Sequence, residues 1–308
     1  MGEPRSVVIT GASRGLGLAS ATHLYNLGWR VVAAMRSVDV GLERLRAATG
    51  AAADDPRLVG VRLDLDDPAA IAAAARAIEE AVGAPDALVH NAGIAAVGST
   101  EDMPFEVWEG LFRTNLFGPV RLTQELLPSM RAAGRGRIVV ISSQGGVRGM
   151  PLISAYSASK GALERWAEAL AEEIAPFGMG VTILVSGTFN TDILTEQTIE
   201  YGDPDGPYAA HSAGIRRTGG LAVKLAARPE GFARALATFL DERAPFARHA
   251  VGLDARMLVF ASRLLPSRLL HHIVRLAMHL PHHGAFQDRR PSRVAVDNPS
   301  SEESEQHG

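Results

Sequence analysis

Six short apolar runs recur along the first two thirds of the chain, each followed by a polar or glycine-containing turn. They lie at residues 6–10, 30–35, 58–63, 87–89, 137–141 and 181–185. Because the runs lack the alternation of polar and apolar residues that marks a strand with one solvent-exposed face, we expect strands that are buried on both faces. Such strands are typical of a parallel sheet, so the pattern predicts an α/β fold with helices on both faces of the sheet.

The segments between these runs repeat apolar residues at helical spacing. We expect helices that end near 27 and that span 41–49, 68–82, 106–112, 118–132, 155–174 and 228–242. Gly28 is the expected stop of the first helix, because glycine favours the C-terminal cap. On the 155–174 helix, Glu164, Glu168 and Glu172 are assigned to the wetter face.

Residues 187–227 break this rhythm, with many Gly, Thr and Tyr residues. An irregular insertion of this size is predicted to be a lid or substrate loop. Residues 256–281 form a predicted C-terminal helical extension, whose helix at 266–280 ends at Pro281. One domain is therefore expected over residues 1–281, followed by a polar and disordered tail at 282–308.

The composition narrows the function classes. A net charge of −3 gives no basic excess for nucleic acid, and the absence of cysteine excludes disulfides and thiolate metal sites. The lack of cysteine and of an apolar leader favours a cytoplasmic setting. A histidine cluster could suggest a metal, but Pro281 interrupts it and no acid completes it, so no metal is expected. The cluster comprises His271, His272, His279, His282 and His283.

Glycines follow the first strand at Gly11, Gly15 and Gly17, just before a helical pattern. A strand, a glycine turn and a helix N-terminus together present backbone N–H groups to a phosphate. The glycines also permit close approach of a bound backbone or ligand. This segment therefore predicts a nucleotide site.

Tyr156 and Lys160 are four residues apart, so both project from one face of the predicted helix. Lowering a tyrosine pKa from ~10 to about 7 needs roughly 4 kcal/mol. One positive charge ~4 Å away at an effective dielectric of ~20 supplies about that much, but side chains one turn apart start ~5–6 Å apart. A second cation or a hydrogen bond must therefore help if this pair transfers protons.

Taken together, these motifs resemble the short-chain dehydrogenase/reductase superfamily over roughly residues 5–255. The resemblance rests on residues 10–17, Asp64, residues 91–93, Asn115, Ser143, Tyr156 and Lys160, in the family's order and spacing. It implies a doubly wound Rossmann fold and an NAD(P)-dependent oxidoreductase that acts on CH–OH groups.

The resemblance implies a role for each catalytic candidate. Tyr156 is the expected general acid/base, and Ser143 is expected to bind the substrate oxygen. Lys160 is expected to lower the tyrosine pKa and to hold the cofactor ribose. Asn115 is expected to hold a water in a proton relay. Taken singly, each residue also has an ordinary structural explanation.

The resemblance also implies the cofactor contacts, which are Gly11, Ser13, Arg14, Gly15, Leu16, Gly17, Arg36, Asp64, Leu65, Asn91, Ala92, Gly93, Tyr156, Lys160, Gly187 and Thr191. An acid usually ends the second strand of NAD enzymes, whereas Arg36 lies there in this chain. With Arg14 it suits a 2′-phosphate, so NADP(H) is expected, although both arginines could be solvated surface residues. Two departures from the family are Ser186 for the usual proline and His90 for an asparagine.

The substrate is expected to be lipophilic, because apolar residues follow Ser143 and Gly187. They are Val147, Met150, Ile153, Phe189, Ile193, Leu194, Ile199, Tyr201 and Tyr208. The helix at 266–280 has an apolar face and a basic stripe, and resembles the extensions of retinol- and steroid-type members. It could cover the substrate loop, contact another subunit or lie on an anionic membrane.

Two further expectations concern assembly and the alternative function. Trp166 and Phe177 are more apolar than one core requires, which favours a homodimer or homotetramer. The alternative to an enzyme is a non-catalytic NADP(H)-sensing or scaffolding protein on the same fold.

Overall fold

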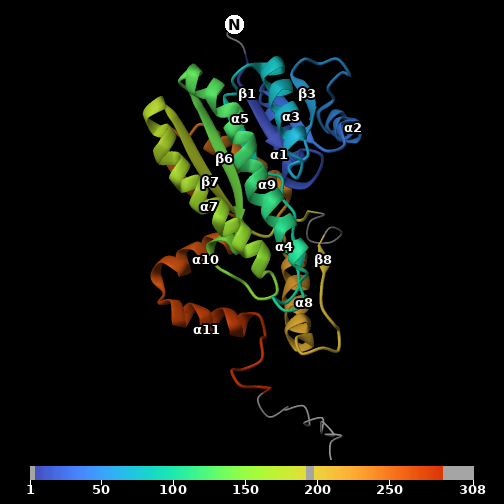
Figure 1. Cartoon of the computed structure of the whole chain (residues 1–308), viewed down its shortest axis with the longest axis vertical. Coiled ribbons are helices and arrows are strands. Elements are labelled where there is room, and N and C mark those ends of the chain that lie inside the picture. The colour runs from blue at the N-terminus through green and yellow to red at the C-terminus, as the bar shows by residue number, and fades with distance from the viewer. Residues whose placement is uncertain (1–3, 192–197, 287–308) are drawn as a thin grey trace, which may run out of the picture.

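A seven-stranded parallel sheet forms the centre of the molecule in the computed structural model, which describes residues 4–191 and 198–286 (Figure 1). The strand order is β3-β2-β1-β4-β6-β7-β9. The strands are β1 (Ser6–Thr10), β2 (Arg30–Met35), β3 (Leu58–Arg62), β4 (Ala87–His90), β6 (Gly136–Ser143), β7 (Met179–Ser186) and β9 (Phe246–Val251). The predicted fold class and all six predicted strands are confirmed.

The seventh strand, β9, was not predicted. It lies at the edge of the sheet beside β7, and all of its residues except Val251 are only half-buried. Arg248 and His249 interrupt its apolar pattern. An edge strand has one neighbour and less cover, so its sequence lacks the continuous apolar run that marked the inner strands.

Helices cover both faces of the sheet. One face packs against α1 (Gly15–Asn26), α2 (Val38–Thr49) and α9 (Pro229–Leu240). The other packs against α3 (Pro68–Val82), α5 (Gly118–Ala133) and α7 (Ser154–Ile174). A short helix α4 (Phe105–Phe112) leads through a π-helical turn at Arg113–Phe117 into α5. A four-residue helix, α6 (Gln144–Val147), follows β6, and a 3₁₀ turn at Ala175–Phe177 follows α7.

The chain reverses its direction across the sheet between β1 and β4. In an open α/β sheet, the carboxyl ends of the strands on either side of such a switch leave a crevice that binds ligands. Gly11 follows β1 at this edge, Asn91 follows β4, and Ser143 ends β6. The topology therefore collects motifs that are far apart in the sequence.

The prediction of an irregular segment at 187–227 was wrong in part. Helix α8 (Ala209–Lys224) fills much of it, and the short strand β8 (Ile199–Glu200) pairs with β5 (Ala96–Val97). Three glycines inside α8, at 214, 219 and 220, weaken the helical signal in the sequence. Ile193 and Leu194 lie outside the described residues.

The C-terminal extension forms two helices, α10 (Leu253–Leu264) and α11 (Ser267–Ala277). The expected end at Pro281 was wrong, because α11 stops at Ala277 and His279 has a left-handed φ of 53°. Figure 1 shows α8, α10 and α11 together at the end of the molecule away from the N-terminus. Of the predicted tail at 282–308, residues 287–308 lie outside the described part. Among the helices of the described residues, none is long and apolar enough to cross a bilayer.

Candidate active site

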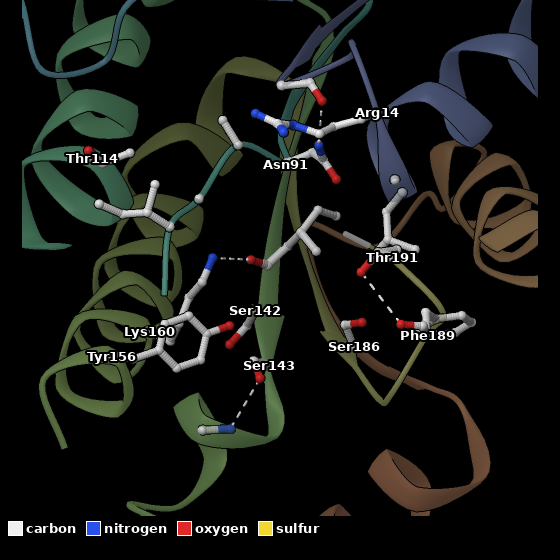
Figure 2. Close-up of a pocket in the computed structure, with 18 of the residues that line it drawn as sticks. Arg14, Asn91, Thr114, Ser142, Ser143, Tyr156, Lys160, Ser186, Phe189 and Thr191 are labelled. Atoms are coloured by element: carbon white, nitrogen blue, oxygen red, sulfur yellow. Dashed lines mark hydrogen bonds between the residues drawn. The ribbon is translucent and has the colours of Figure 1, made fainter. Parts of the chain in front are cut away.

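A cleft of about 830 Å³ opens along the carboxyl ends of β1, β4, β6 and β7. Figure 2 shows Tyr156, Lys160 and Ser143 on one side of it and Ser186, Phe189 and Thr191 on the other. The glycine turn after β1 lies at one end of this space, and Ile215 of α8 and Met278, just after α11, also line it. The glycine turn and the Tyr156–Lys160 pair therefore line one and the same cavity.

The glycine turn is packed too tightly for other residues. Gly11 and Gly15 have positive φ values of 68° and 54°. A Cβ at Gly17 would lie 2.2 Å from the Gly11 carbonyl oxygen and 2.6 Å from Asn91 Nδ2. Gly17 therefore lies beneath the turn rather than on the cleft wall, and the N-terminus of α1 is directed at the cavity.

Thr10 and Asn91 fasten this turn to β4. Asn91 Nδ2 donates to the Thr10 carbonyl oxygen at 2.9 Å, while the backbone N–H groups of Asn91 and Ala92 each donate to Thr10 Oγ1 at 3.0 Å. Thr10 is fully buried and was not among the predicted site residues. Its signal in the sequence was its place as the last strand residue before the glycines.

Two arginines line the cleft, and a third, Arg44, contacts the glycine turn. Arg14 and Arg36 line the cleft, and Arg36 is exposed at the end of β2. Arg44, on α2, donates from Nη1 to the Ser13 carbonyl oxygen at 3.3 Å, a contact that the sequence did not predict. Asp64 and Leu65 form the neighbouring wall. This end of the cleft is therefore suited to an anion.

Tyr156 and Lys160 extend from the first turns of α7 into the cleft. Burial raises the pKa of Tyr156, and its hydrogen bond with Ser143 opposes that rise. The expectation of a tyrosine pKa lowered by Lys160 is therefore wrong in direction for the protein alone. Lys160 Nζ instead donates to the Ile141 carbonyl oxygen at 2.9 Å (Figure 2). Ser143 Oγ accepts from the Gly145 backbone N–H at 3.3 Å and caps α6.

Glu164 lies one helical turn beyond Lys160, and its assignment to the wet face was wrong, because it is completely buried. Its carboxylate accepts from Ser142 Oγ at 2.6 Å and from Arg248 Nη2 at 2.6 Å. Burial lowers the pKa of Lys160 to about 8, and the negative charge of Glu164 opposes that fall. Lys160 and Glu164 are thus two buried charged residues beside the cleft, and the half-buried Arg248 pairs with Glu164.

Lysine itself is uncommon in this chain, where only Lys160 and Lys224 occur among 31 basic residues. An arginine remains charged at any physiological pH, whereas a lysine can lose its proton when it is buried. The residue type at position 160 therefore permits a change of charge that arginine does not.

Asn115 lies within the π-helical turn and does not line the cleft. Its Oδ1 accepts from the Ile94 backbone N–H at 2.9 Å, and its Nδ2 donates to the Ile94 carbonyl oxygen and to Ser159 Oγ, both at 3.0 Å. The side chain thus fixes the loop after β4 against α7. The water relay that the resemblance implies for Asn115 stays a prediction.

His90 takes the place of the usual asparagine and is buried. Its Nε2 lies 2.8 Å from Thr123 Oγ1, and its ring meets Trp166 edge-on at 6.0 Å between centroids. Burial and the charge of Lys160 lower the pKa of His90 to about 3, so the ring is neutral. Trp166 is thus half-buried against the core of the chain, whereas Phe177, the other residue behind the predicted oligomer, is 46% exposed. The oligomer itself stays a prediction.

The apolar lining differs in part from the prediction. Met150, Ile153 and Phe189 lie on the cleft wall as expected. Val147 packs into the core, Ile199 is exposed, Tyr201 packs beside α4, and Tyr208 Oη donates to Glu101 Oε2 at 2.9 Å. The additional apolar lining comes from Ile94, Ile215 and Met278.

Of the predicted site residues, the cleft lining thus includes all except Gly17 and Asn115. Thr191 meets the glycine turn, since a Cβ at Gly15 would lie 3.3 Å from Thr191 Cγ2. Sequence reasoning missed Gln144, Thr188 and Asp254, which also line the cleft. Within residues 4–191 and 198–286, no three His, Cys, Asp or Glu side chains are grouped to hold a metal.

Comparison with known proteins gives consistent matches. The family model described as short chain dehydrogenase matches residues 5–202. The "Uncharacterized oxidoreductase YbbO" of Escherichia coli strain K12 is 32% identical over 275 residues, which cover 88% of this chain and 94% of that protein.

Solved structures agree. A short-chain dehydrogenase from Streptomyces avermitilis has a TM-score of 0.76 and 34% identity, with 90% of this chain and 96% of that chain covered. A metagenomic short-chain oxidoreductase solved in complex with NADP has a TM-score of 0.63 and 29% identity, with 80% and 96% covered.

The buried charges generate a testable titration. Because the Glu164 carboxylate raises the pKa of Lys160, E164Q should move the Lys160 midpoint from near 8 to a lower pH. At ~6 Å and an effective dielectric of ~20, Coulomb's law allows a fall of about one pH unit or more. Carbon NMR of Cε-labelled lysine measures it directly, because Lys224 gives the only other signal and K224R assigns the pair.

E168Q is the matched control. Glu168 lies on the same helix but pairs with the exposed Arg165 at 2.6 Å. The same Lys160 midpoint in E164Q and E168Q, with both variants folded by thermal unfolding, would contradict the electrostatic role given to Glu164.

Proposed function

Since this chain belongs to the short-chain dehydrogenase family, we propose that it transfers a hydride between NADP(H) and a lipophilic alcohol or carbonyl compound. The observation that carries the proposal is the meeting of Tyr156, Ser143 and Lys160 at one end of a cleft whose other end is a glycine turn at a helix N-terminus. A nicotinamide cofactor would supply or accept the hydride.

The residues of the cleft fit such a cofactor. Gly11, Gly15 and the N-terminus of α1 line the cleft, where backbone N–H groups could bind a pyrophosphate. Arg14, Arg36 and Arg44 offer guanidinium groups to a 2′-phosphate, for which arginine has matching donor geometry. A related oxidoreductase in complex with NADP supports the choice, which remains a proposal for this chain.

The proton chemistry is assigned to Tyr156 Oη, with Ser143 Oγ holding the substrate oxygen. Because burial raises the pKa of Tyr156, its phenol keeps its proton, which suits donation to a developing alkoxide. The positive charge of Lys160 then stabilises the phenolate that remains after the proton is donated. The spacing of Tyr156 and Lys160 indicates that the lysine alone does not stabilise the phenolate enough. A hydrogen bond from Ser143 and the positive charge of an oxidised nicotinamide would supply the remainder.

The apolar lining supports a lipophilic substrate. Ile94, Met150, Ile153, Ile215 and Met278 surround the space between Tyr156 and the C-terminal helices. Burial of each such contact favours apolar groups by roughly 25 cal/mol per Å². The alternative, a non-catalytic NADP(H)-binding scaffold, predicts cofactor binding without turnover, and an NADPH oxidation assay with lipophilic aldehydes and ketones separates the two.

The C-terminal helices carry a further part of the proposal. Leu253, Met257, Phe260 and Leu264 of α10 are 63–75% exposed at helical spacing, and Leu269, Ile273 and Leu276 of α11 are 43–65% exposed. The charged side chains of these helices are Arg256, Arg263, Arg268, Arg275 and a single acid, Asp254, which points into the cleft wall. Exposed apolar stripes whose neighbouring charged residues are all arginines are suited to an anionic lipid surface.

Met278 lines the cleft and its carbonyl oxygen lies near Gly214 of α8, so α11 also borders the cavity. A lipid surface on these helices would place the cavity mouth close to a store of apolar substrate. Alternatively, a second copy of this chain could cover the same apolar stripes, which would give a homodimer or homotetramer. The oligomeric state and a cytoplasmic location both remain proposals.

Replacement of Tyr156 by Phe should reduce turnover by about 10²-fold or more, because general acid/base catalysis supplies ~10²–10⁴-fold. NADPH binding should change little, since the ring remains in place. Turnover and binding are measured by absorbance at 340 nm and by fluorescence titration. Y156F activity within tenfold of the parent would refute the assignment of the tyrosine.

Arg36→Asp should move preference from NADPH towards NADH. The change removes a cation at the end of β2 and adds a charge that repels a 2′-phosphate while accepting ribose hydroxyls. The ratio of kcat/KM for the two cofactors is the measure. Arg62→Asp, an exposed charge reversal at the end of neighbouring β3, is the control, and an equal ratio in both variants would show that Arg36 does not select the cofactor.

The membrane proposal is tested by co-sedimentation with phosphatidylserine-containing vesicles. The parent should bind at low salt and release at high salt, because screening weakens contacts with the anionic surface. F260S/L276S should lose binding, whereas L27S/F177S, which alters similarly exposed residues far from α11, should retain it. Failure of the parent to bind at low salt would reject a lipid partner. A mass by light scattering that falls only in F260S/L276S would instead support self-association.

A further inference from the structure

The segment after β7 is held by contacts from the C-terminal part of the chain. The Gly187 backbone N–H donates to the Val251 carbonyl oxygen at 2.8 Å, and the Thr188 N–H donates to Asp254 Oδ2 at 2.7 Å. The Ser186 hydroxyl donates to the carbonyl oxygen of its neighbour Gly187 at 3.0 Å. Since serine does not lock φ as proline does, the position of this segment depends on residues 251–254.

Asp254 connects three separate pieces of chain. Besides the Thr188 N–H, its Oδ2 accepts from Gln144 Nε2 at 2.8 Å, and its Oδ1 accepts from the Ala255 N–H at 2.9 Å. Gln144 directly follows Ser143, whose hydroxyl caps the helix that Gln144 begins. One carboxylate therefore links the segment after β7, the Ser143 turn and the first turn of α10.

The carboxylate is packed closely against two glycines. A Cβ at Gly187 would lie 2.0 Å from Asp254 Oδ1, and a Cβ at Gly252 would lie 2.9 Å from the same atom. The two glycines thus admit the carboxylate, and Gly252 additionally has a φ of 106°. Hydrogen bonds to an ionised acceptor are about twice as strong as neutral ones, which suits a fixed anchor.

We propose that Asp254 is a positioning residue that sets the nicotinamide end of the site through Thr188 and Gln144. It does so without contacting the reacting atoms, and the inference rests on the proposed hydride transfer. Loss of the carboxylate should loosen the Gly187–Thr188 segment and the Ser143 turn together. The adenosine end, built on Gly11–Gly17 and Arg36, should be untouched.

The variants D254A, D254N and E230A test this. D254A removes the hydrogen bonds to both Thr188 and Gln144. D254N can place its amide oxygen at the Oδ2 position and keep the Thr188 and Gln144 bonds, so it is the rescue variant. Glu230 is likewise an acid in the first turn of a helix, α9, but is exposed and away from the cleft, so E230A controls for the loss of a helix-terminal charge.

Two binding probes separate the ends of the site. Adenosine 2′,5′-bisphosphate occupies only the adenosine end, and its affinity should be the same in all variants. NADPH should bind several-fold more weakly to D254A, and kcat should fall about tenfold or more, since a 1 Å misplacement can cost 10²-fold. D254N should recover kcat to within about threefold of the parent.

Equal NADPH affinity and kcat in D254A and E230A would overturn the proposal, as would an equal loss of bisphosphate and NADPH affinity in D254A. If D254A does not fold, Q144A removes the Gln144 hydrogen bond alone and should lower kcat with unchanged bisphosphate binding. An unchanged kcat in Q144A would then count against the proposal. If the parent protein binds NADPH but reduces no carbonyl compound, the proposed function is rejected instead. The comparison of NADPH affinity between D254A and E230A would still test the role of Asp254.

Discussion

The burial of the Lys160 charge is the constraint on which the end of the cleft beside Tyr156 depends. A lone ammonium group taken out of water is costly, and the protein offsets that cost with the Ile141 carbonyl and the Glu164 carboxylate. Glu164 is in turn held by Ser142 and Arg248, which come from β6 and β9. The edge strand β9, which the sequence did not predict, therefore supplies Arg248 as the positive partner of the buried Glu164.

The same arrangement explains why so few groups suffice at the cleft. A parallel sheet brings the ends of β1, β4, β6 and β7 to one edge, and a few polar side chains then fix these ends. Thr10 joins the first pair, Asn115 holds the loop after β4, and Asp254 spans the turns after β6 and β7. Each anchor satisfies buried backbone groups as well as orienting neighbours, so structural and functional roles coincide.

The C-terminal extension has two structural features. Its first turn supplies Asp254 to the cleft wall, and Met278, just beyond α11, lines the cavity, while the outward stripes of both helices remain apolar. An element that only closed a cavity would bury its apolar face on the body of the protein. Here Leu270 is buried, but Leu269, Ile273 and Leu276 face outward. The extension is therefore coupled to the site at one end and available to a surface at the other.

The sequence by itself determined the strands, the glycine turn and the spacing of Tyr156 and Lys160, because these depend on local periodicity and on backbone freedom. It could not assign Glu164, since the helical pattern groups that residue with Glu168 and only contact with Ser142 and Arg248 makes its burial favourable. Nor could it find β9, Thr10 or Asp254 as parts of the site. Their roles arise from hydrogen bonds between residues tens of positions apart, and tertiary packing alone decides which such groups meet.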